Sequence, residues 1–294
     1  MDEKILKQFM KCGYVYDKEL YPTTDGTPQG GIISPTLANM TLDGMENLIK
    51  QKYWSNTKGT ISVKNNEKKV HLIKYADDFI VTASDRETLK GIKEMLKIFL
   101  GQRGLILSEE KTKLTSIHEG FDFLGWNFRK YNGKLIIKPS SKSIRKIRKT
   151  ISEVIKENKT STQENLIYQL NQIIRGWAEY HHSACSKETF SQIDHIIWEM
   201  LWKWAKRRHP NKCKSWIVNK YWKYHKGRKW SFKSDKNVLF YMSDMPIIRY
   251  PQLRLNTNPF LDAEYFENRK KNRDSKRRKA MRSNKAAQIG YYAL

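Results

Sequence analysis

The sequence predicts an α+β protein in which an antiparallel sheet with helices on one face is followed by an α-helical region. Short β-branched or aromatic segments joined by tight-turn signals occupy the first 140 residues. Beyond Ser140, apolar residues recur every three or four positions, which is helical spacing. The charge changes at the same place: residues 1–140 hold 22 Lys/Arg against 17 Asp/Glu, whereas residues 141–294 hold 34 against 13.

The composition indicates a folded, strongly basic chain. Its 294 residues are 39% hydrophobic and 12% aromatic, enough for real cores. It has no apolar run of about 18 residues, no secretory signal at its N-terminus, and three widely spaced cysteines. We therefore expect a soluble cytoplasmic protein with no membrane partner. The net charge of +26 favours a nucleic-acid partner, the alternative being a solvated basic surface.

The first predicted elements surround a glycine-rich segment. Residues 2–11 have the apolar spacing of a short helix. In residues 24–35, glycines would let backbone approach a ligand closely, and Ser34 followed by Pro35 is a typical helix start. A flexible turn before a surface helix is the alternative, because the segment lacks the lysine of a P-loop. The helix is expected to continue through Leu37, Met40 or Thr41, Met45 and Leu48.

The next pattern is a hairpin with two carboxylates at its tip. Residues 70–74 and 79–83 are rich in strand formers and flank Asp77 and Asp78. Adjacent carboxylates between buried strands repel each other and cost desolvation unless cations neutralise them. Mg²⁺ prefers such hard oxygen ligands, and two ions can assist phosphoryl or nucleotidyl transfer. The alternative is an ordinary turn, where Asp is common.

The rest of the first half predicts a helix and further strands. Residues 84–87 form a capping box that opens a helix ending near Gly101 or Gly104. Residues 105–107 predict a third strand. Residues 121–128 and 134–137 flank Asn132-Gly133, a strong hairpin signal. The inward side chains of the helix are expected to be Leu89, Ile92, Leu96 and Phe99.

Three helices with apolar stripes are predicted after Ser140. Most tryptophans there are expected in the core, the alternative being platforms on which bases stack. The basic faces are expected to contact RNA through Arg145, Lys146, Arg148, Lys149, Arg207 and Arg208. Residues 268–285 form a basic run that we expect to be mobile until it meets phosphate. The stripes are Ile144, Ile147, Ile151 and Ile155; Leu166, Leu170, Ile173 or Ile174 and Trp177; and Phe190, Ile193, Ile197, Leu201 and Trp204.

Two histidine–cysteine groups raise the question of zinc. His181, His182 and Cys185 form one group, and His209, Cys213 and His225 form the other. Neither group has the paired spacing typical of a structural zinc site, so zinc is not favoured.

Taken together, the motifs resemble the palm of group II intron reverse transcriptases in order and spacing. They are residues 26–35 (Gly-Thr-Pro-Gln-Gly-Gly-Ile-Ile-Ser-Pro), 75–78 (Tyr-Ala-Asp-Asp), 110–112 (Glu-Lys-Thr) and 123–126 (Phe-Leu-Gly-Trp). Residues 170–180 and 202–210 are similar to the thumb and maturase-specific region of the same family. The resemblance implies a partial right-hand polymerase palm over residues 1–139, a helical thumb and maturase region over 140–232, and a basic extension over 233–294.

The resemblance also implies an activity and a site. The family comprises RNA-directed DNA polymerases that also assist splicing of their own intron, so intron RNA and a DNA/RNA primer–template are the expected partners and Mg²⁺ the expected cofactor. Its motifs place catalytic and metal-binding carboxylates at Asp77 and Asp78, and a lysine that helps pyrophosphate leave at Lys111. They place nucleotide and template contacts at Pro28, Gln29 and Gly30, and the primer grip at Phe123, Leu124 and Gly125.

One family feature has no counterpart before Gly26. The family's palm begins with a strand carrying another metal-binding aspartate, preceded by a fingers region. The chain therefore resembles the C-terminal part of a split, truncated or decayed intron protein. In the split case a companion chain would supply both features, and we expect this chain alone to lack polymerase activity. The alternative is a non-catalytic RNA-binding maturase module or a decayed remnant.

Overall fold

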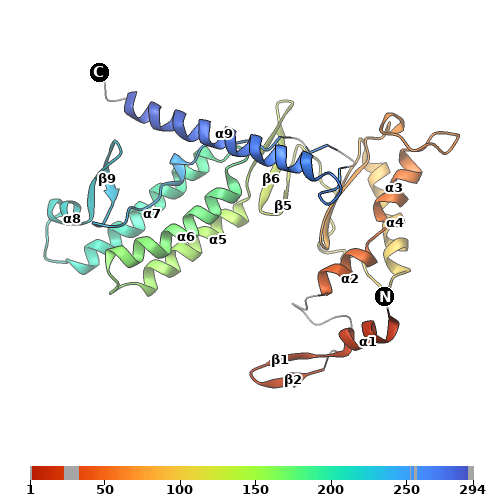
Figure 1. Cartoon of the computed structure of the whole chain (residues 1–294), viewed down its shortest axis with the longest axis horizontal. Helices are drawn as coiled ribbons and strands as arrows, with labels where there is room; N and C mark the ends of the chain where they lie inside the picture. Colours follow the sequence, from red (N-terminus) through yellow and green to blue (C-terminus); the bar gives the residue numbers. More distant parts are fainter. Residues whose placement is uncertain (1, 23–32, 252, 255–256, 291–294) are drawn as a thin grey trace. The chain divides into compact units, whose positions relative to one another are not determined.

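The computed structural model describes residues 2–22, 33–251, 253–254 and 257–290 (Figure 1). The chain forms two compact units, residues 1–114 (the first unit) and residues 115–294 (the second unit). Helices and small antiparallel sheets occur in both, as expected for an α+β protein. The domain limits at 139/140 and 232/233 were expected from the family resemblance, whereas the two units are separated by compactness. Those domain limits therefore stay predictions.

The first unit begins with a capped helix and a small hairpin. The backbone amide of Lys4 donates to Asp2 Oδ1 at 2.8 Å, so Asp2 caps the helix predicted over residues 2–11. The elements of this unit are α1 (Glu3–Lys11), β1 (Tyr14–Tyr16), β2 (Glu19–Tyr21), α2 (Ser34–Thr41), α3 (Met45–Tyr53), a 3-10 turn (Val63–Asn65), β3 (His71–Tyr75), β4 (Asp78–Thr82) and α4 (Arg86–Gly101).

The single helix predicted after Ser34 is two helices. Gly44 has a φ of +85°, a left-handed conformation that glycine adopts without steric cost, and it separates α2 from α3. Ser34 is also not the cap that was predicted. It is the first helical residue, with Pro35 beside it in the first turn and Ile33 before it.

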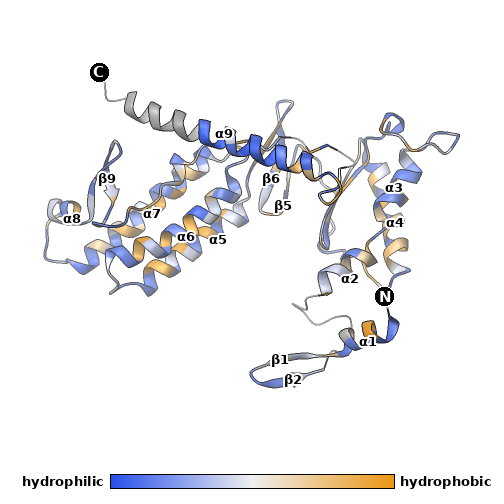
Figure 2. Ribbon diagram, viewed as in Figure 1, coloured by the Kyte–Doolittle hydropathy of each residue, from blue (hydrophilic) through white to orange (hydrophobic). Residues whose placement is uncertain are grey.

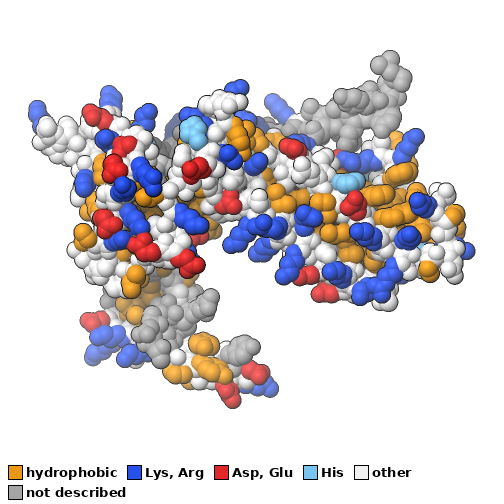
Figure 3. All heavy atoms as spheres, turned by 180° about the vertical axis from the view of Figure 1, so that it is seen from behind, with side chains coloured by type: hydrophobic (Ala, Val, Ile, Leu, Met, Phe, Trp, Pro, Cys, Tyr) orange, Lys and Arg blue, Asp and Glu red, His pale blue; other side chains and the backbone are white. Residues whose placement is uncertain are grey.

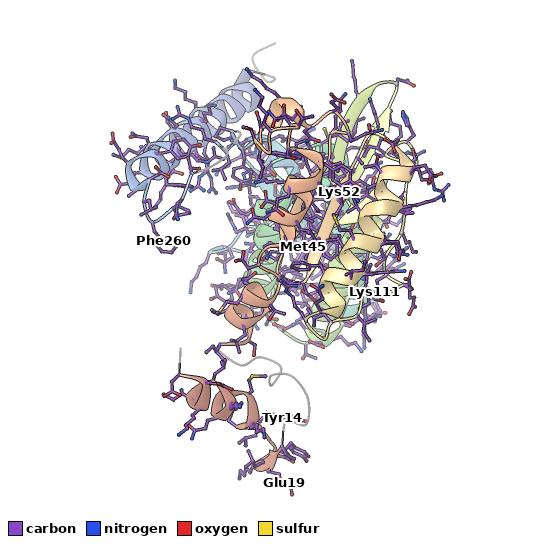
Figure 4. All side chains as sticks on the ribbon, turned by 90° about the vertical axis from the view of Figure 1, so that its right-hand side faces the viewer. Tyr14, Glu19, Met45, Lys52, Lys111 and Phe260 are labelled. Carbon is purple, nitrogen blue, oxygen red and sulfur yellow. The ribbon has the colours of Figure 1, made fainter. Side chains whose placement is uncertain are left out.

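A small core joins α3, α4 and one face of the β3–β4 hairpin. Met45, Ile49, Ile92 and Leu96 are almost fully buried there, and Figure 4 labels Met45 on α3 beside α4. Burying a side chain of this size contributes about 1.5–3 kcal/mol. The partly buried side chains that complete this core from the hairpin are Leu72, Phe79 and Val81.

Helix α4 has the predicted end but a different cap. Asp85, not Ser84, accepts the hydrogen bond from the Thr88 amide, at 2.8 Å. That bond holds the pKa of the Asp85 carboxyl well below its usual value. The strand predicted over residues 105–107 is wrong, because this segment pairs with no strand in the described part of the chain and Ile106 is 95% exposed.

The second unit combines a three-stranded sheet, a helical core and a further hairpin. The hairpin predicted at Asn132-Gly133 is confirmed, whereas the strand predicted over residues 121–128 is divided at Leu124-Gly125. Its elements are β5 (Phe121–Phe123), β6 (Trp126–Tyr131), β7 (Lys134–Pro139), α5 (Ser141–Glu157), α6 (Gln163–His181), α7 (Lys187–Arg208), α8 (Lys214–Tyr221), β8 (Trp222–His225), β9 (Arg228–Phe232), η2 (Met242–Asp244) and α9 (Ala263–Gly290).

The antiparallel sheet expected across the first half is not continuous. Among the described residues, strands β3 and β4 pair only with each other, and β5, β6 and β7 form a separate sheet in the second unit. The sequence pattern identified the segments that form β3 to β7, but it missed the hairpins β1–β2 and β8–β9 and did not predict which strands pair. Hydrogen bonding between distant strands leaves no local signature in the residues.

Helices α5, α6 and α7 run side by side and carry the main core (Figure 1). Figure 2 shows hydrophobic and hydrophilic residues alternating along these helices, and the hydrophobic ones supply most of the buried core. The three predicted stripes are confirmed: most of their members are buried, and Ile144, Ile173 and Trp177 pack against the core while partly exposed. Asp194 of α7 accepts the backbone amides of Met242 and Ser243, both at 2.9 Å, and so ties η2 to this core.

Residues 268–285 belong to helix α9, a helix that was not predicted, and their mobility before they meet phosphate stays a prediction. Arg277 of α9 forms an ion pair with Glu179 of α6.

In the part of the chain that the structure describes, no helix combines the length and the apolar character needed to cross a bilayer.

Candidate functional site

The carboxylate pair lies at the tip of the β3–β4 hairpin, as predicted. Ala76 and Asp77 form the two-residue turn, and Asp78 begins β4 opposite Tyr75. Ala76 has a φ of +53°, a conformation that costs a non-glycine residue about 1–2 kcal/mol. Such backbone strain is often found at functional turns.

Both carboxylates are exposed, and this corrects one argument made from the sequence. The strands are not buried on both faces, so Asp77 and Asp78 do not pay a desolvation cost here. The strand register places Asp78 on the same face as Ile73 and Tyr75, which are 53% and 64% exposed. The other face packs on the core of the first unit. The pair therefore lies beside an open, partly apolar sheet face.

The donor chemistry at the tip fits a hard divalent cation. Two adjacent exposed carboxylates supply oxygen ligands, and Mg²⁺ in proteins is commonly held by one or two carboxylates together with substrate phosphates and waters. Among the described residues, no three His, Cys, Asp or Glu side chains converge into a complete metal site. Asp77 and Asp78 could thus provide part of a coordination sphere.

The histidine–cysteine groups make other contacts. His181 Nε2 lies 3.1 Å from Ser143 Oγ, and His182 Nδ1 lies 2.5 Å from the Glu179 carbonyl oxygen. His209 Nε2 lies 2.8 Å from the Tyr221 hydroxyl. These ring nitrogens take part in the packing of the second unit.

Lys111, labelled in Figure 4, lies in an exposed turn. A cluster of ion pairs made by Glu109 connects this turn to α4. Glu109 accepts from Lys93 Nζ at 2.5 Å and from Lys97 Nζ at 2.7 Å. The hydrogen bonds from these lysines lower the pKa of Glu109 to about 2. The turn is closed by the Thr112 amide, which donates to the Ser108 carbonyl at 3.0 Å. The role of Glu109 was not predicted from the sequence, because nothing near it in the sequence indicates that it pairs with lysines of α4.

The segment expected to contact nucleotide and template cannot be placed beside these groups. Pro28, Gln29 and Gly30 lie outside the described residues.

The turn between β5 and β6 is held in an unusual conformation by α6. Leu124 and Gly125 have φ values of +48° and +78°, which favour glycine and strain a leucine. The Tyr180 hydroxyl donates to the Leu124 carbonyl at 2.6 Å, and the Ser140 amide donates to the Gly125 carbonyl at 2.9 Å. Phe123 precedes this turn as the last residue of β5. The segment predicted to be the primer grip is thus fixed to the helical core.

His181 supports the same turn from inside the core. Its ring lies 4.5 Å from the Trp126 ring and 4.3 Å from the Trp177 ring, centroid to centroid. Burial lowers the pKa of His181 to about 4, so the imidazole is neutral at neutral pH. The sequence offered one signal for this role, namely the placement of His181 one helical turn after Trp177.

The basic side chains predicted to contact RNA differ in availability. Arg145, Lys146, Arg148 and Lys149 of α5 are all exposed, and Lys149 forms a loose ion pair with Glu153 at 3.7 Å. Figure 3 shows Lys and Arg side chains on the surface of this unit.

The two arginines at the end of α7 also differ in their availability for RNA. Arg207 is exposed. Arg208 instead donates to the carbonyl of Ser161 at 2.5 Å, and its guanidinium lies 4.5 Å from the Trp204 ring. Arg208 therefore contributes to the packing of α7.

A second basic surface lies along α9. A groove of about 770 Å³ lies between this helix and the nearby residues Pro251 and Arg254. The groove is lined mainly by long polar and cationic side chains, among them Arg254, Arg269, Arg273, Lys276 and Lys279. Such a lining suits a polyanion rather than an apolar ligand.

Comparison with protein families gives two adjacent matches. Residues 1–128 match the family described as reverse transcriptase (RNA-dependent DNA polymerase). Residues 144–222 match the family described as group II intron, maturase-specific domain. The first match includes the β3–β4 hairpin and the β5–β6 turn, and the second includes helices α6 and α7.

Individual relatives agree with these matches. The chain is 27% identical over 175 residues to the group II intron-encoded protein LtrA of Lactococcus lactis, an alignment covering 43% of this chain and 29% of that protein. It is 28% identical over 140 residues to protein YkfC of Escherichia coli, covering 41% and 37%. It is 23% identical over 260 residues to an uncharacterized 91 kDa protein in the cob intron of Schizosaccharomyces pombe, covering 66% and 32%. The chain thus spans about a third of the length of these relatives.

Proposed function

Because the chain belongs to the family of group II intron reverse transcriptases and maturases, we propose that it takes part in RNA-directed DNA synthesis and in splicing of a group II intron. The observation that supports this most strongly is the adjacency of the two family matches, with an exposed carboxylate pair in the first and exposed basic helices in the second.

In this proposal the hairpin tip is part of the polymerase site. Asp77 and Asp78 hold Mg²⁺, which when bound stabilises the charge that develops during nucleotidyl transfer. Lys111 donates a proton to the departing pyrophosphate, and the ion pairs of Glu109 keep its turn against α4. Pro28, Gln29 and Gly30 contact the incoming nucleotide and the template. A partial right-hand palm is the fold proposed for this part of the chain.

The second unit binds the nucleic acid. The strained turn at Phe123, Leu124 and Gly125 presents backbone to the primer, since α6 fixes its conformation through Tyr180. Arg145, Lys146, Arg148, Lys149 and Arg207 contact phosphates of intron RNA or of the primer–template. Within this unit, residues 140–232 are the proposed thumb and maturase region, and residues 233–294 the proposed basic extension.

A two-ion site needs more ligands than the two aspartates provide. We therefore propose that a companion chain supplies the fingers and a further metal-binding aspartate. The companion is expected to complete the site around Asp77 and Asp78.

A second candidate function is a non-catalytic RNA-binding maturase module. The independent packing of the second unit favours it, because that unit has its own core and carries the maturase-specific match without needing the hairpin tip. In this case the basic helices act alone and the aspartates have no catalytic role.

Two assays on the full chain test the proposal. The first measures splicing of a group II intron RNA at limiting Mg²⁺, and the second measures extension of a DNA primer on an RNA template, with and without the companion chain. Stimulation of both supports the proposal. Stimulation of splicing alone supports the maturase module, and failure of both contradicts the family-based function.

A further inference from the structure

Three tryptophan rings form a row on the surface of the second unit. Trp202 and Trp198, one turn apart on α7, have ring planes 4° apart and centroids 5.9 Å apart. Trp230 of β9 continues the row, 15° from the plane of Trp198 and 6.4 Å from its centroid. Trp230 is 58% exposed, so the row ends at the surface.

The row rests on a rigid base. Trp222 of β8 is buried behind it, with its ring 5.7 Å from Trp202 and 6.1 Å from Trp198. Trp222 pairs across the hairpin with Phe232, which is fully buried in the main core. The rings are therefore ordered before any ligand arrives, which lowers the entropic cost of binding.

Cationic side chains accompany the row. Lys206 follows Trp202 by one turn of α7, and Lys226 lies in the turn between β8 and β9. Both lysines are exposed, and neither forms an ion pair with a carboxylate of the described residues. Figure 3 shows hydrophobic side chains on the face of this unit with Lys and Arg around them.

An exposed tryptophan ring that is backed by two partly buried, stacked rings and has unpaired lysines nearby suits one class of ligand. Unpaired bases stack on aromatic rings while the phosphates between them meet lysines, whereas the bases of a duplex are already stacked on each other. We propose that Trp198, Trp202 and Trp230 form a stacking platform for unpaired nucleotides of single-stranded nucleic acid. This inference rests on the proposed nucleic-acid function and specifies single-stranded segments as the ligand at this surface.

Fluorescence anisotropy with labelled RNA tests the platform. The full chain is titrated into a 12-nucleotide single-stranded RNA and into a 12-base-pair RNA duplex. Trp230→Ala is expected to weaken single-strand binding by about 5- to 100-fold and to change duplex binding by less than about twofold. Trp230→Phe, which retains a ring, should stay within about threefold of the unsubstituted chain. The matched control is Tyr168→Ala, which removes an exposed aromatic ring of α6 and should change neither.

Salt dependence separates stacking from charge. Trp230→Ala should leave the slope of log affinity against log salt unchanged, whereas Lys206→Gln should flatten it by about 0.7 for a single strand. Equal single-strand binding by Trp230→Ala, or an equal loss for duplex, would overturn the platform. So would sedimentation showing that the unsubstituted chain self-associates and Trp230→Ala does not, since the row would then be a contact between copies. If the unsubstituted chain binds neither RNA, the proposed function fails as well.

Discussion

Single side chains hold the proposed primer-contacting turn in place. Leu124 adopts a backbone conformation that costs a non-glycine residue about 1–2 kcal/mol, and the Tyr180 hydroxyl and the His181 ring act on the turn from α6. A strained conformation persists only where its surroundings fix it. The end of α6 therefore connects the helical core to the turn.

His181 should make the stability of the second unit depend on pH. Its pKa is about 4 in the folded chain against about 6.5 when unfolded, so the unfolded chain binds the extra proton between these values. Stability is then fully present above pH 6.5 and is lost as the pH falls towards 4. We expect a loss of about 1–3 kcal/mol between pH 7 and pH 4.5, and a smaller loss for His181→Gln, which does not titrate.

Urea unfolding followed by tryptophan fluorescence measures this, since eight of the nine tryptophans lie in the second unit. The titrations of Glu109 and Asp194 lie lower in pH or act in the opposite direction, because the pKa of Glu109 is about 2 and burial raises that of Asp194. An equal pH dependence in the two proteins would show that another group is responsible.

At the level of elements, features that depend on neighbouring residues were predicted better than features that depend on pairing between distant strands. The α5, α6 and α7 stripes and the Asn132-Gly133 hairpin follow from spacing and turn chemistry, which are properties of neighbouring residues. The strand at residues 105–107 and a continuous sheet depended on distant partners and were wrong. A local signal can also be ambiguous. Gly44 lies inside helical spacing, and such a glycine is compatible with either a continuous or a divided helix.

The candidate site was predictable to a similar extent. The position of Asp77 and Asp78 at a hairpin tip followed from the strand pattern, but their exposure did not, because it depends on which strands and helices pack around them. Glu109 and Tyr180 could not be found from sequence, since each acts through a partner that is distant along the chain. For His181 the sequence held one signal, its place one helical turn after Trp177.

The turn that carries Lys111 should loosen when its link to α4 is removed. Glu109→Gln abolishes the ion pairs with Lys93 and Lys97, so we expect trypsin to cleave after Lys111 and Lys113 several times faster. Glu87→Gln is the matched control, because it removes an ion pair with Lys90 on the same helix without touching the turn. Unchanged cleavage in Glu109→Gln would mean that the turn is fixed by other contacts.

At the level of the whole molecule, the uneven charge should govern binding to RNA. Residues 141–294 carry a net charge of +21 and residues 1–140 carry +5. Replacing Arg145, Lys146, Arg148 and Lys149 with glutamine should weaken binding to intron RNA and flatten its salt slope by about 0.7–0.9 for each lost phosphate contact. The control replaces four exposed lysines of the first unit, Lys52, Lys58, Lys64 and Lys69. Filter binding between about 50 and 200 mM salt measures the slopes, and equal slopes in both variants would remove α5 from the RNA interface.

The central claim is that the exposed carboxylate pair belongs to a polymerase site, and it is tested most directly by one substitution. Primer extension on an RNA template with Mg²⁺ is measured for the chain mixed with the companion chain proposed above, comparing Asp77→Asn with Asp43→Asn, which alters another exposed aspartate of the first unit. Loss of a ligand's charge should lower the rate of Asp77→Asn by roughly a thousandfold or more, with RNA binding unchanged and Asp43→Asn fully active. DNA synthesis that proceeds equally well with Asp77→Asn would contradict the assignment.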